Sequence, residues 1–238
     1  MKKDFVFRRV EKKYVMTDSQ YTAFLERISP YMQLDEYGLH TICNIYYDTE
    51  DDVLISRSID KPVYKEKLRL RTYGVPDKDC EAFIEIKKKY KGVVYKRRVS
   101  MSLSEAENFL NNGVYPKKDS QILREIAYFM SFYHPIPKIC LVYEREAYFG
   151  IEDPEFRLTI DHNIRCRYDE LSLEAGAHGD TYFSENEKLM EIKINSAMPL
   201  WLSAILTELE IYPVSFSKFG RFHERAHHEE KIEQEEFI

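Results

Sequence analysis

Two neighbouring runs of alternating charged and apolar residues constrain the fold of this chain more than any other feature. In residues 65–71 a Lys or Arg stands at every second position, and residues 81–89 alternate in a similar way. Because successive side chains of a β-strand point to opposite faces of a sheet, each run predicts a strand with one charged and one apolar face. The charged face would carry Lys65, Lys67, Arg69 and Arg71 from the first strand and Glu81, Phe83, Glu85, Lys87 and Lys89 from the second.

The same pattern recurs along the chain. A charged strand face that occurs once is typical of the wet outer side of an antiparallel sheet. Here residues 4–15, 139–149, 156–167 and 189–194 also predict strands that combine an apolar face with Lys, Arg or Glu. Residues 93–101 predict a further strand with basic residues on both faces, so the pattern leaves its orientation open.

Helical spacing of apolar residues and capping residues predict helices near residues 17–30, 103–113, 120–133 and 199–209. The 238 residues suffice for one large core, and the 14% of aromatic residues indicates a folded globular protein. We therefore predict an α+β fold in a single domain, residues 1–238, with a charged C-terminal tail at residues 225–238. Its strands would form a closed antiparallel β-barrel with the helices packed outside.

Charge and composition argue against several classes of protein. The formal net charge of -6 argues against a nucleic-acid binder, which should show a basic balance. No segment reaches the roughly 20 apolar residues of a membrane span, and the N-terminus lacks the apolar region of a secretory signal. No metal or redox spacing relates Cys43, Cys80, Cys140 and Cys166. We therefore expect a reduced, cytoplasmic protein without a membrane span.

If the helices cover the apolar backs of the strands, the charged faces must line the interior of the barrel. Such a lining repels itself unless it holds an anion of high charge density, and phosphate chains are anions of this kind. Glu11, Glu85 and Glu191 would either bind a hard divalent cation or hold the basic side chains in order, and the second role is the commoner one. The basic residues of the predicted lining are Arg9, Lys13, Lys67, Arg69, Arg71, Lys87, Lys96, Arg98, Arg145, Arg157 and Lys193.

An ordered set of short motifs resembles one protein family. The motifs lie at residues 11–14, 67–71, 85–87, 96–98, 143–145, 156–161, 191–193 and 217–219. Their order is similar to that in the VTC catalytic domain, the polyphosphate polymerase of the vacuolar transporter chaperone complex. That family resembles the triphosphate tunnel metalloenzymes. The resemblance implies an antiparallel barrel that binds triphosphate together with Mn²⁺ or Mg²⁺, and it implies ATP and polyphosphate as partners.

The resemblance also implies roles for individual residues. Carried over motif by motif, the phosphate-binding set is Lys13, Arg69, Arg71, Lys87, Lys96, Arg145, Arg157 and Lys218, and the metal ligand is Glu191. Together with the basic lining, this set predicts a catalytic group and a phosphate-binding group. The catalytic group is Arg69, Arg71, Lys87, Arg145 and Arg157, and the phosphate-binding group is Lys13, Lys67, Lys96, Arg98, Lys193 and Lys218.

The chain departs from the family in two ways. We expect neither the SPX-type N-terminal domain nor the membrane spans of the eukaryotic complex, which leaves open whether synthesis is coupled to transport. Hydrolytic relatives commonly begin with Glu-x-Glu-x-Lys, whereas residues 9–13 read Arg-Val-Glu-Lys-Lys, and this difference favours the polymerase branch.

These arguments predict a polyphosphate polymerase that transfers the γ-phosphoryl group of ATP to a growing chain. One alternative is a tripolyphosphatase or nucleoside triphosphatase of the same fold, with water as the acceptor. Another is a non-catalytic sensor that binds polyphosphate or nucleotide. The three hypotheses differ in their product, which is polymer, orthophosphate or none.

Overall fold

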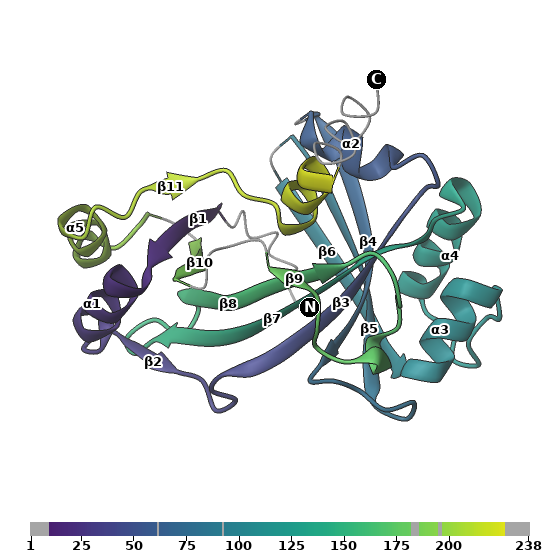
Figure 1. Ribbon diagram of the computed structural model, residues 1–238, viewed down its shortest axis with the longest axis horizontal. Coiled ribbons are helices and arrows are strands. Elements are labelled where there is room, and N and C mark those ends of the chain that lie inside the picture. Colours follow the sequence, from purple (N-terminus) through teal and green to yellow (C-terminus); the bar gives the residue numbers. More distant parts are fainter. Residues whose placement is uncertain (1–9, 61, 92, 182–185, 195–196, 227–238) are drawn as a thin grey trace, which may run out of the picture. The chain divides into compact units, whose positions relative to one another are not determined.

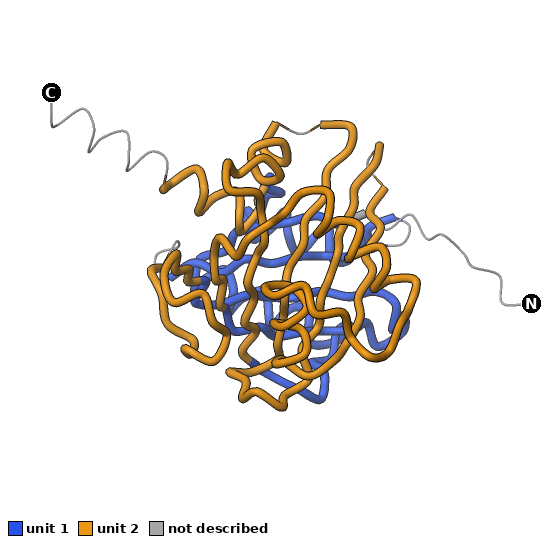
Figure 2. Tube along the Cα trace, turned by 90° about the vertical axis from the view of Figure 1, so that its right-hand side faces the viewer, with its two compact units in different colours: residues 1–40, 143–164, 183–215 blue, residues 41–142, 165–182, 216–238 orange. Residues whose placement is uncertain are grey.

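A computed structural model describes residues 10–60, 62–91, 93–181, 186–194 and 197–226. The chain forms two compact units, which Figure 2 shows in blue and orange. Unit 1 comprises residues 1–40, 143–164 and 183–215, and unit 2 comprises residues 41–142, 165–182 and 216–238. Strands β7 (Ile136–Gly150) and β8 (Arg157–Arg167) each contribute residues to both units.

Unit 1 contains antiparallel strands in the order β11-β1-β10-β8-β7-β2 (Figure 1). Besides its parts of β7 and β8, its elements are β1 (Val10–Thr17), α1 (Asp18–Ile28), β2 (Met32–Leu34), β10 (Glu187–Ile194), α5 (Leu200–Glu208) and β11 (Pro213–Val214). A capping box begins α1, because the Thr17 hydroxyl accepts from the Gln20 N–H and the Gln20 side chain accepts from the Thr17 N–H.

The core of unit 1 lies between the apolar face of its strands and its two helices. Tyr14 of β1 and Ile192 of β10 are buried there, together with Phe24 of α1 and Leu202 of α5. Because alternate residues of β1 and β10 enter this core, Glu11, Lys13, Glu191 and Lys193 are left on the opposite, polar face.

Unit 2 contains an antiparallel meander in which β3, β4, β5 and β6 are successive neighbours. Its elements are β3 (His40–Asp48), α2 (Val53–Ile59), β4 (Tyr64–Tyr73), β5 (Glu81–Tyr90), β6 (Val93–Ser102), α3 (Leu103–Asn112), α4 (Gln121–Tyr133), a 3-10 turn (Leu173–Ala175), β9 (Asp180–Thr181) and a helix over residues 218–226. It also includes residues 136–142 of β7 and 165–167 of β8, whereas the first residue of β3 belongs to unit 1.

The core of unit 2 lies between the apolar face of the meander and the two helices α3 and α4. Leu70 of β4 and Ile84 of β5 are fully buried against a cluster that includes Phe109 of α3 and Phe129 of α4. The Ser102 hydroxyl caps the start of α3 by accepting from the Glu105 N–H. In both units the helices therefore cover the apolar strand faces, as the sequence predicts.

The closed barrel is a prediction that the structure corrects. Within the described residues, β11 and β6 each have one hydrogen-bonded strand neighbour, so the strand order has two ends and the sheet is open. Strand alternation indicates which face of each strand is polar, but closure depends on the tilt and stagger of strands that are distant in sequence. The large antiparallel sheet with helices on its apolar face is confirmed.

The orientation of β6, which the sequence left open, is decided by its register with β5. Glu85 lies opposite Arg98 and Lys87 lies opposite Lys96, so these basic residues share the charged face of the meander. Arg97 lies on the other face, where it pairs with Glu125 of α4. Part of the predicted N-terminal strand, including Arg9, lies outside the described residues, as does the tail from residue 227. No helix in the described part of the chain combines the length and apolar composition of a membrane span.

Candidate functional site

The polar face of the unit 2 meander gathers most of the predicted basic residues of that unit. The β4–β5 register places Lys67 opposite Lys87 and Arg69 opposite Glu85. The β5–β6 register adds Lys96 and Arg98 to the same face. We call the set Lys67, Arg69, Arg71, Glu85, Lys87, Lys96 and Arg98 the basic face of unit 2.

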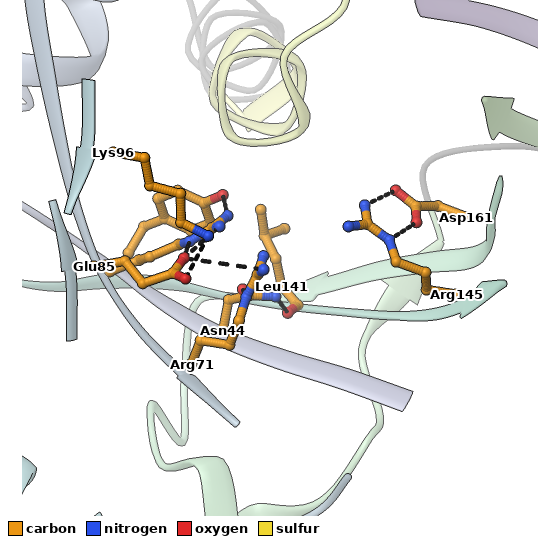
Figure 3. A network of polar contacts seen from close by, with 9 residues as sticks. Asn44, Arg71, Glu85, Lys96, Leu141, Arg145 and Asp161 are labelled. Atoms are coloured by element: carbon orange, nitrogen blue, oxygen red, sulfur yellow. Dashed lines mark hydrogen bonds and ion pairs between the residues drawn. The ribbon is translucent and has the colours of Figure 1, made fainter. Parts of the chain in front are cut away.

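One buried carboxylate, that of Glu85, lies at the centre of this face (Figure 3). Its Oε2 atom lies 2.5 Å from Arg69 Nη2 and accepts a hydrogen bond of 2.6 Å from Arg69 Nε. Its Oε1 atom lies 2.5 Å from Lys96 Nζ, and Arg71 Nη1 is 3.9 Å from Oε2. Burial by itself raises the pKa of Glu85, but the charges of Arg69, Arg71 and Lys96 outweigh it and lower this pKa to about 2.

Arg71 is held in place by β3. Its Nε atom donates to the Asn44 side-chain oxygen at 2.7 Å, and the Asn44 amide nitrogen donates to the Leu141 carbonyl at 3.0 Å (Figure 3). Both Arg71 and Asn44 are buried, with 4% and 0% of their surface exposed. Such a chain of hydrogen bonds fixes the guanidinium group before any ligand arrives, which reduces the entropy lost on binding.

Arg69 and Lys67 make further contacts on this face. Arg69 Nη1 donates to the Tyr46 hydroxyl at 3.0 Å, and Lys67 Nζ donates to the Ser217 hydroxyl at 3.0 Å. Ser217 precedes the helix over residues 218–226 and accepts from the Gly220 N–H at 3.2 Å. Lys218, the first residue of that helix, is buried. The Nζ atom of Lys67 on β4 therefore contacts the residue that directly precedes Lys218.

The electrostatic potential of the basic face is positive despite Glu85. Burial and the charges of Arg69 and Arg71 together lower the pKa of Lys96 to about 8, although the charge of Glu85 acts to raise it. The same two arginines and Lys67 outweigh the effect of burial on Tyr46 and lower its pKa to about 7. Because cations are disfavoured here and anions are favoured, the face is suited to an anion that carries several charges.

Lys87 and Arg98 are the remaining members of the basic face. Both side chains are exposed, and the Arg98 guanidinium lies 4.8 Å from the centre of the Phe83 ring. Their placement on the charged face agrees with the prediction from the alternation. Their roles in phosphate binding stay predictions.

The polar face of unit 1 carries the other predicted residues. Lys13 Nζ lies 3.1 Å from Glu191 Oε1 and 3.6 Å from Glu11 Oε1. The strand register places Lys193 opposite Glu11 on β1 and opposite Arg157 on β8. Arg157 is exposed, whereas Glu191 is 8% exposed. We call Glu11, Lys13, Arg157, Glu191 and Lys193 the mixed face of unit 1, because acidic and basic residues alternate on it.

Arg145 forms a two-pronged ion pair in unit 1 (Figure 3). Its Nε and Nη2 atoms donate to the two carboxylate oxygens of buried Asp161 at 2.6 and 2.8 Å. Burial alone lowers the pKa of Arg145, but Asp161 raises it, so the guanidinium stays charged. The sequence did not predict Asp161 as a site residue, although the alternation places it on one strand face with Arg157 and Thr159.

The mixed face has oxygen atoms that fit a divalent cation. Glu191 lies directly opposite Thr159, whose buried hydroxyl oxygen has no hydrogen-bond partner within the described residues. The described residues contain no group of three or more His, Cys, Asp or Glu side chains that could hold a metal ion. Mg²⁺ and similar hard cations need only one or two carboxylates when phosphate oxygens and water complete the shell. Glu191 and Thr159 therefore fit the metal role that the sequence predicts for Glu191.

The structure thus divides the predicted site residues between the two units. It brings Lys67, Arg69, Arg71, Lys87, Lys96, Arg98 and Lys218 into unit 2, and Lys13, Arg145, Arg157, Glu191 and Lys193 into unit 1. Sequence reasoning missed Asn44, Tyr46 and Ser217, which contact the arginines and Lys67. The two-residue spacing of Asn44 and Tyr46 on one strand was a usable signal, because it places both on one face.

Glu85→Gln is expected to lower the free energy of unfolding by about 3 kcal/mol at neutral pH, because Arg69, Arg71 and Lys96 then lose a shared carboxylate. The Glu85 pKa falls from an ordinary 4.5 to about 2 in the folded chain. This contribution is therefore complete above pH 4.5 and is lost as the pH falls through about 2. Chemical denaturation of wild type and variant over this range measures it.

Glu125→Gln is the matched control, because Glu125 pairs with Lys88 and Arg97 on the opposite face. Its side chain is 26% exposed, so its removal should cost only about 1 kcal/mol or less. Inorganic tripolyphosphate should restore much of the stability of Glu85→Gln and little of that of Glu125→Gln. Equal losses in the two variants, or an unchanged acid transition in Glu85→Gln, would contradict the central role of Glu85.

Comparison with solved structures shows a shared fold. A candidate adenylate cyclase from Bacillus halodurans matches with a TM-score of 0.56 at 15% identity, over 88% of this chain and 95% of that chain. A candidate adenylyl cyclase from Hippeastrum, described as having a dominant triphosphatase activity, matches with a TM-score of 0.56 at 17% identity, over 91% and 95% of the two chains. A candidate adenylate cyclase from Vibrio parahaemolyticus matches with a TM-score of 0.51 at 14% identity, over 90% of this chain and 97% of that chain.

Comparison of the sequence identifies the family. No curated protein sequence matches the chain. The model of the VTC domain family matches residues 8–226 and so runs through both units, and the structural likeness supports the triphosphate tunnel fold that the motifs imply. The chain therefore belongs to the VTC domain family.

Proposed function

We propose that the protein is a metal-dependent polyphosphate polymerase that transfers the γ-phosphoryl group of ATP to the end of a polyphosphate chain. The observation that carries this proposal is the group of Arg69, Arg71 and Lys96 around the single carboxylate of Glu85. Several fixed cations on one positive face suit a substrate and a product that are both chains of phosphate. Membership of the VTC domain family supports the same conclusion.

In the proposed reaction, a terminal oxygen of the polyphosphate chain attacks the γ-phosphorus of ATP. The bond between that phosphorus and the β–γ bridging oxygen breaks, and ADP leaves with the bond electrons. Such a transfer needs little acid–base chemistry and depends on positioning and charge neutralisation. Arg69 and Arg71 would hold the oxygens of the transferring group, because preorganised donors stabilise the charge that develops on them.

The remaining predicted residues would bind other phosphate groups of the substrates. In unit 2, this group is Lys67, Lys87, Lys96 and Arg98 of the basic face, together with Lys218 of the helix over residues 218–226. In unit 1, it comprises Lys13, Arg157 and Lys193 of the mixed face, together with Arg145. Glu191 with Thr159 would hold Mn²⁺ or Mg²⁺. The bound cation would supply charge neutralisation at the phosphate oxygens.

A triphosphatase is the second candidate function, and the dominant triphosphatase activity described for the Hippeastrum protein favours it. In this reaction water replaces the chain end as the acceptor, and the same basic face would serve. Residues 9–13 differ from the Glu-x-Glu-x-Lys opening of the hydrolytic relatives, which supports the polymerase.

One incubation of the purified chain with ATP and Mn²⁺ or Mg²⁺ tests the proposal. We expect a ladder of polyphosphate on a gel, ADP in proportion to the phosphate incorporated, and loss of both products when a chelator removes the metal. Release of orthophosphate without polymer would instead establish the triphosphatase. Tight binding of ATP or polyphosphate with no product would leave the protein as a sensor.

A further inference from the structure

Tyr46 contacts Arg69 of the basic face, but neither the family motifs nor the proposed function uses it. It lies on β3 directly opposite Arg69 and accepts a hydrogen bond of 3.0 Å from Arg69 Nη1. Its ring centre is 5.2 Å from that of Phe219 in the helix over residues 218–226. These contacts hold the Tyr46 phenol oxygen beside the Arg69 guanidinium group, which we propose holds the transferring phosphoryl group.

The hydrogen bonds of the Tyr46 hydroxyl are incomplete. A phenol has one O–H donor as well as acceptor sites. Arg69 occupies an acceptor site, but the Tyr46 proton meets no acceptor in the part of the chain that the structure describes. An oxygen of a ligand held by Arg69 would lie close enough to accept it.

We propose that Tyr46 is a further phosphate-binding residue, whose hydroxyl donates to an oxygen of the triphosphate that Arg69 holds and whose ionisation opposes binding. This inference rests on the proposed function, because it assumes a phosphate chain on the basic face. It adds a neutral donor to a set that is otherwise cationic. It also makes phosphate binding depend on a proton that leaves near neutral pH.

The charged groups around Tyr46 explain why its proton is labile. From β4, Lys67, Arg69 and Arg71 outweigh the effect of burial and lower the Tyr46 pKa to about 7. Glu85 of β5 pairs with Arg69 and with Lys96 of β6, and the helix that contacts Tyr46 through Phe219 also carries Lys218 and His223. The neutral phenol is therefore the main form below pH 7 and the phenolate above it.

The sign of the pH effect follows from this charge change. Below pH 7 the phenol donates to the bound anion, whereas above it the phenolate repels the anion and competes with it for Arg69. Bound tripolyphosphate must in turn raise the Tyr46 pKa, because the two effects are linked through one free energy. Each pH unit above the Tyr46 pKa of the free protein should then weaken tripolyphosphate binding up to about tenfold. This weakening should stop at the higher Tyr46 pKa of the complex.

Inorganic tripolyphosphate is the probe, and calorimetry of its binding from about pH 6 to about pH 8 is the first measurement. At about pH 6, Tyr46→Phe should bind about fivefold to tenfold more weakly than wild type, since one donor to a charged group is lost. Between about pH 6 and about pH 8, the affinity of the wild type for tripolyphosphate should fall by a factor about ten times larger than the affinity of Tyr46→Phe. Lys96 titrates in both proteins, so its contribution cancels in this comparison.

Tyr47→Phe is the matched control. Tyr47 is the next residue of β3, but it is buried on the apolar face, where its hydroxyl donates to Asn111 at 3.1 Å. Burial raises the pKa of Tyr47, so it stays neutral throughout the range. Tyr47→Phe should therefore keep the affinity and the pH dependence of the wild type.

The near-ultraviolet absorbance of tyrosinate provides a direct readout. The difference between titrations of wild type and Tyr46→Phe isolates one of the 18 tyrosines. Its midpoint should lie near pH 7 in the free protein and should rise by about one pH unit or more in saturating tripolyphosphate. Tyr47→Phe should show the same midpoint and the same rise.

Three results would overturn the inference. If Tyr46→Phe bound more weakly by the same factor at every pH, Tyr46 would only position Arg69. If the tyrosinate midpoint did not move with tripolyphosphate, the phenol would not contact the ligand. If wild type bound tripolyphosphate at no pH, the proposed function would fail together with this inference, whereas the first two results leave the proposed function intact.

Discussion

Arg69→Ala is expected to lower kcat for phosphoryl transfer from ATP by about a hundredfold or more, the scale seen when one transition-state donor is lost. The Arg69 guanidinium is fixed by Glu85 at 2.5 and 2.6 Å and by the Tyr46 hydroxyl at 3.0 Å, so it is aimed before substrate arrives. Charge on the transferring phosphoryl group is stabilised best by donors that need no reorganisation. Steady-state kinetics with ATP and Mn²⁺ measures the effect.

Arg69 tests this role more cleanly than its neighbour Arg71. We expect a similar loss of kcat in Arg71→Ala, but the Arg71 side chain is buried and hydrogen-bonded to Asn44, so its removal also disturbs packing. Arg69→Lys separates charge from geometry. It keeps the positive charge but loses the planar fork, and it should recover only part of the lost kcat.

Two further variants serve as comparisons for Arg69→Ala. Arg97→Ala removes the same type of side chain from the opposite face of the meander, where it pairs with Glu125, and should change kcat by about twofold at most. Lys218→Ala should chiefly raise KM or shorten the product chains, because Lys218 lies at a helix start and is assigned to holding phosphate. If Arg69→Ala and Lys218→Ala changed kcat and KM in the same proportion, this division of roles would have to be given up.

Glu191→Gln is expected to abolish metal-dependent turnover at metal concentrations that saturate the wild type, while most of the affinity for tripolyphosphate remains. Glu191 is 8% exposed and lies opposite Thr159, whose buried hydroxyl has no hydrogen-bond partner among the described residues, and we therefore propose the Glu191 carboxylate as the metal ligand. Replacing a carboxylate oxygen by an amide removes the negative charge that a divalent cation needs. Binding of Mn²⁺ in the presence of tripolyphosphate should weaken by about a hundredfold or more.

The other interpretation of Glu191 is that it serves only to hold Lys13, whose Nζ lies 3.1 Å away. Lys13→Gln tests this, because it breaks the same ion pair from the other side. If Glu191 binds metal, Lys13→Gln should raise KM and leave the Mn²⁺ requirement unchanged, whereas Glu191→Gln should change that requirement. Identical effects of the two variants on Mn²⁺ binding and on KM would assign Glu191 to the ion pair alone.

The sequence by itself determined the local structure and the chemistry of the faces. Alternation in residues 65–71 and 81–89 placed Arg69, Arg71 and Glu85 on one face, and the structure finds them in contact. The glycine at position 113, with a φ of 70°, ends α3 where the pattern of residues 103–113 predicted. These features depend on neighbours within a few residues, so a single sequence contains the information.

Tertiary structure decided how these faces are completed. The open ends of the sheet at β11 and β6, and the division of the predicted residues between two units, depend on pairing between strands far apart in the chain. The register of β3 with β4 brings Tyr46 to Arg69 and Asn44 to Arg71, and the final helix brings Ser217 to Lys67. An alternating pattern shows which face a residue is on. It does not show which residue lies opposite, because strand register and helix docking are set by the packing of the whole core.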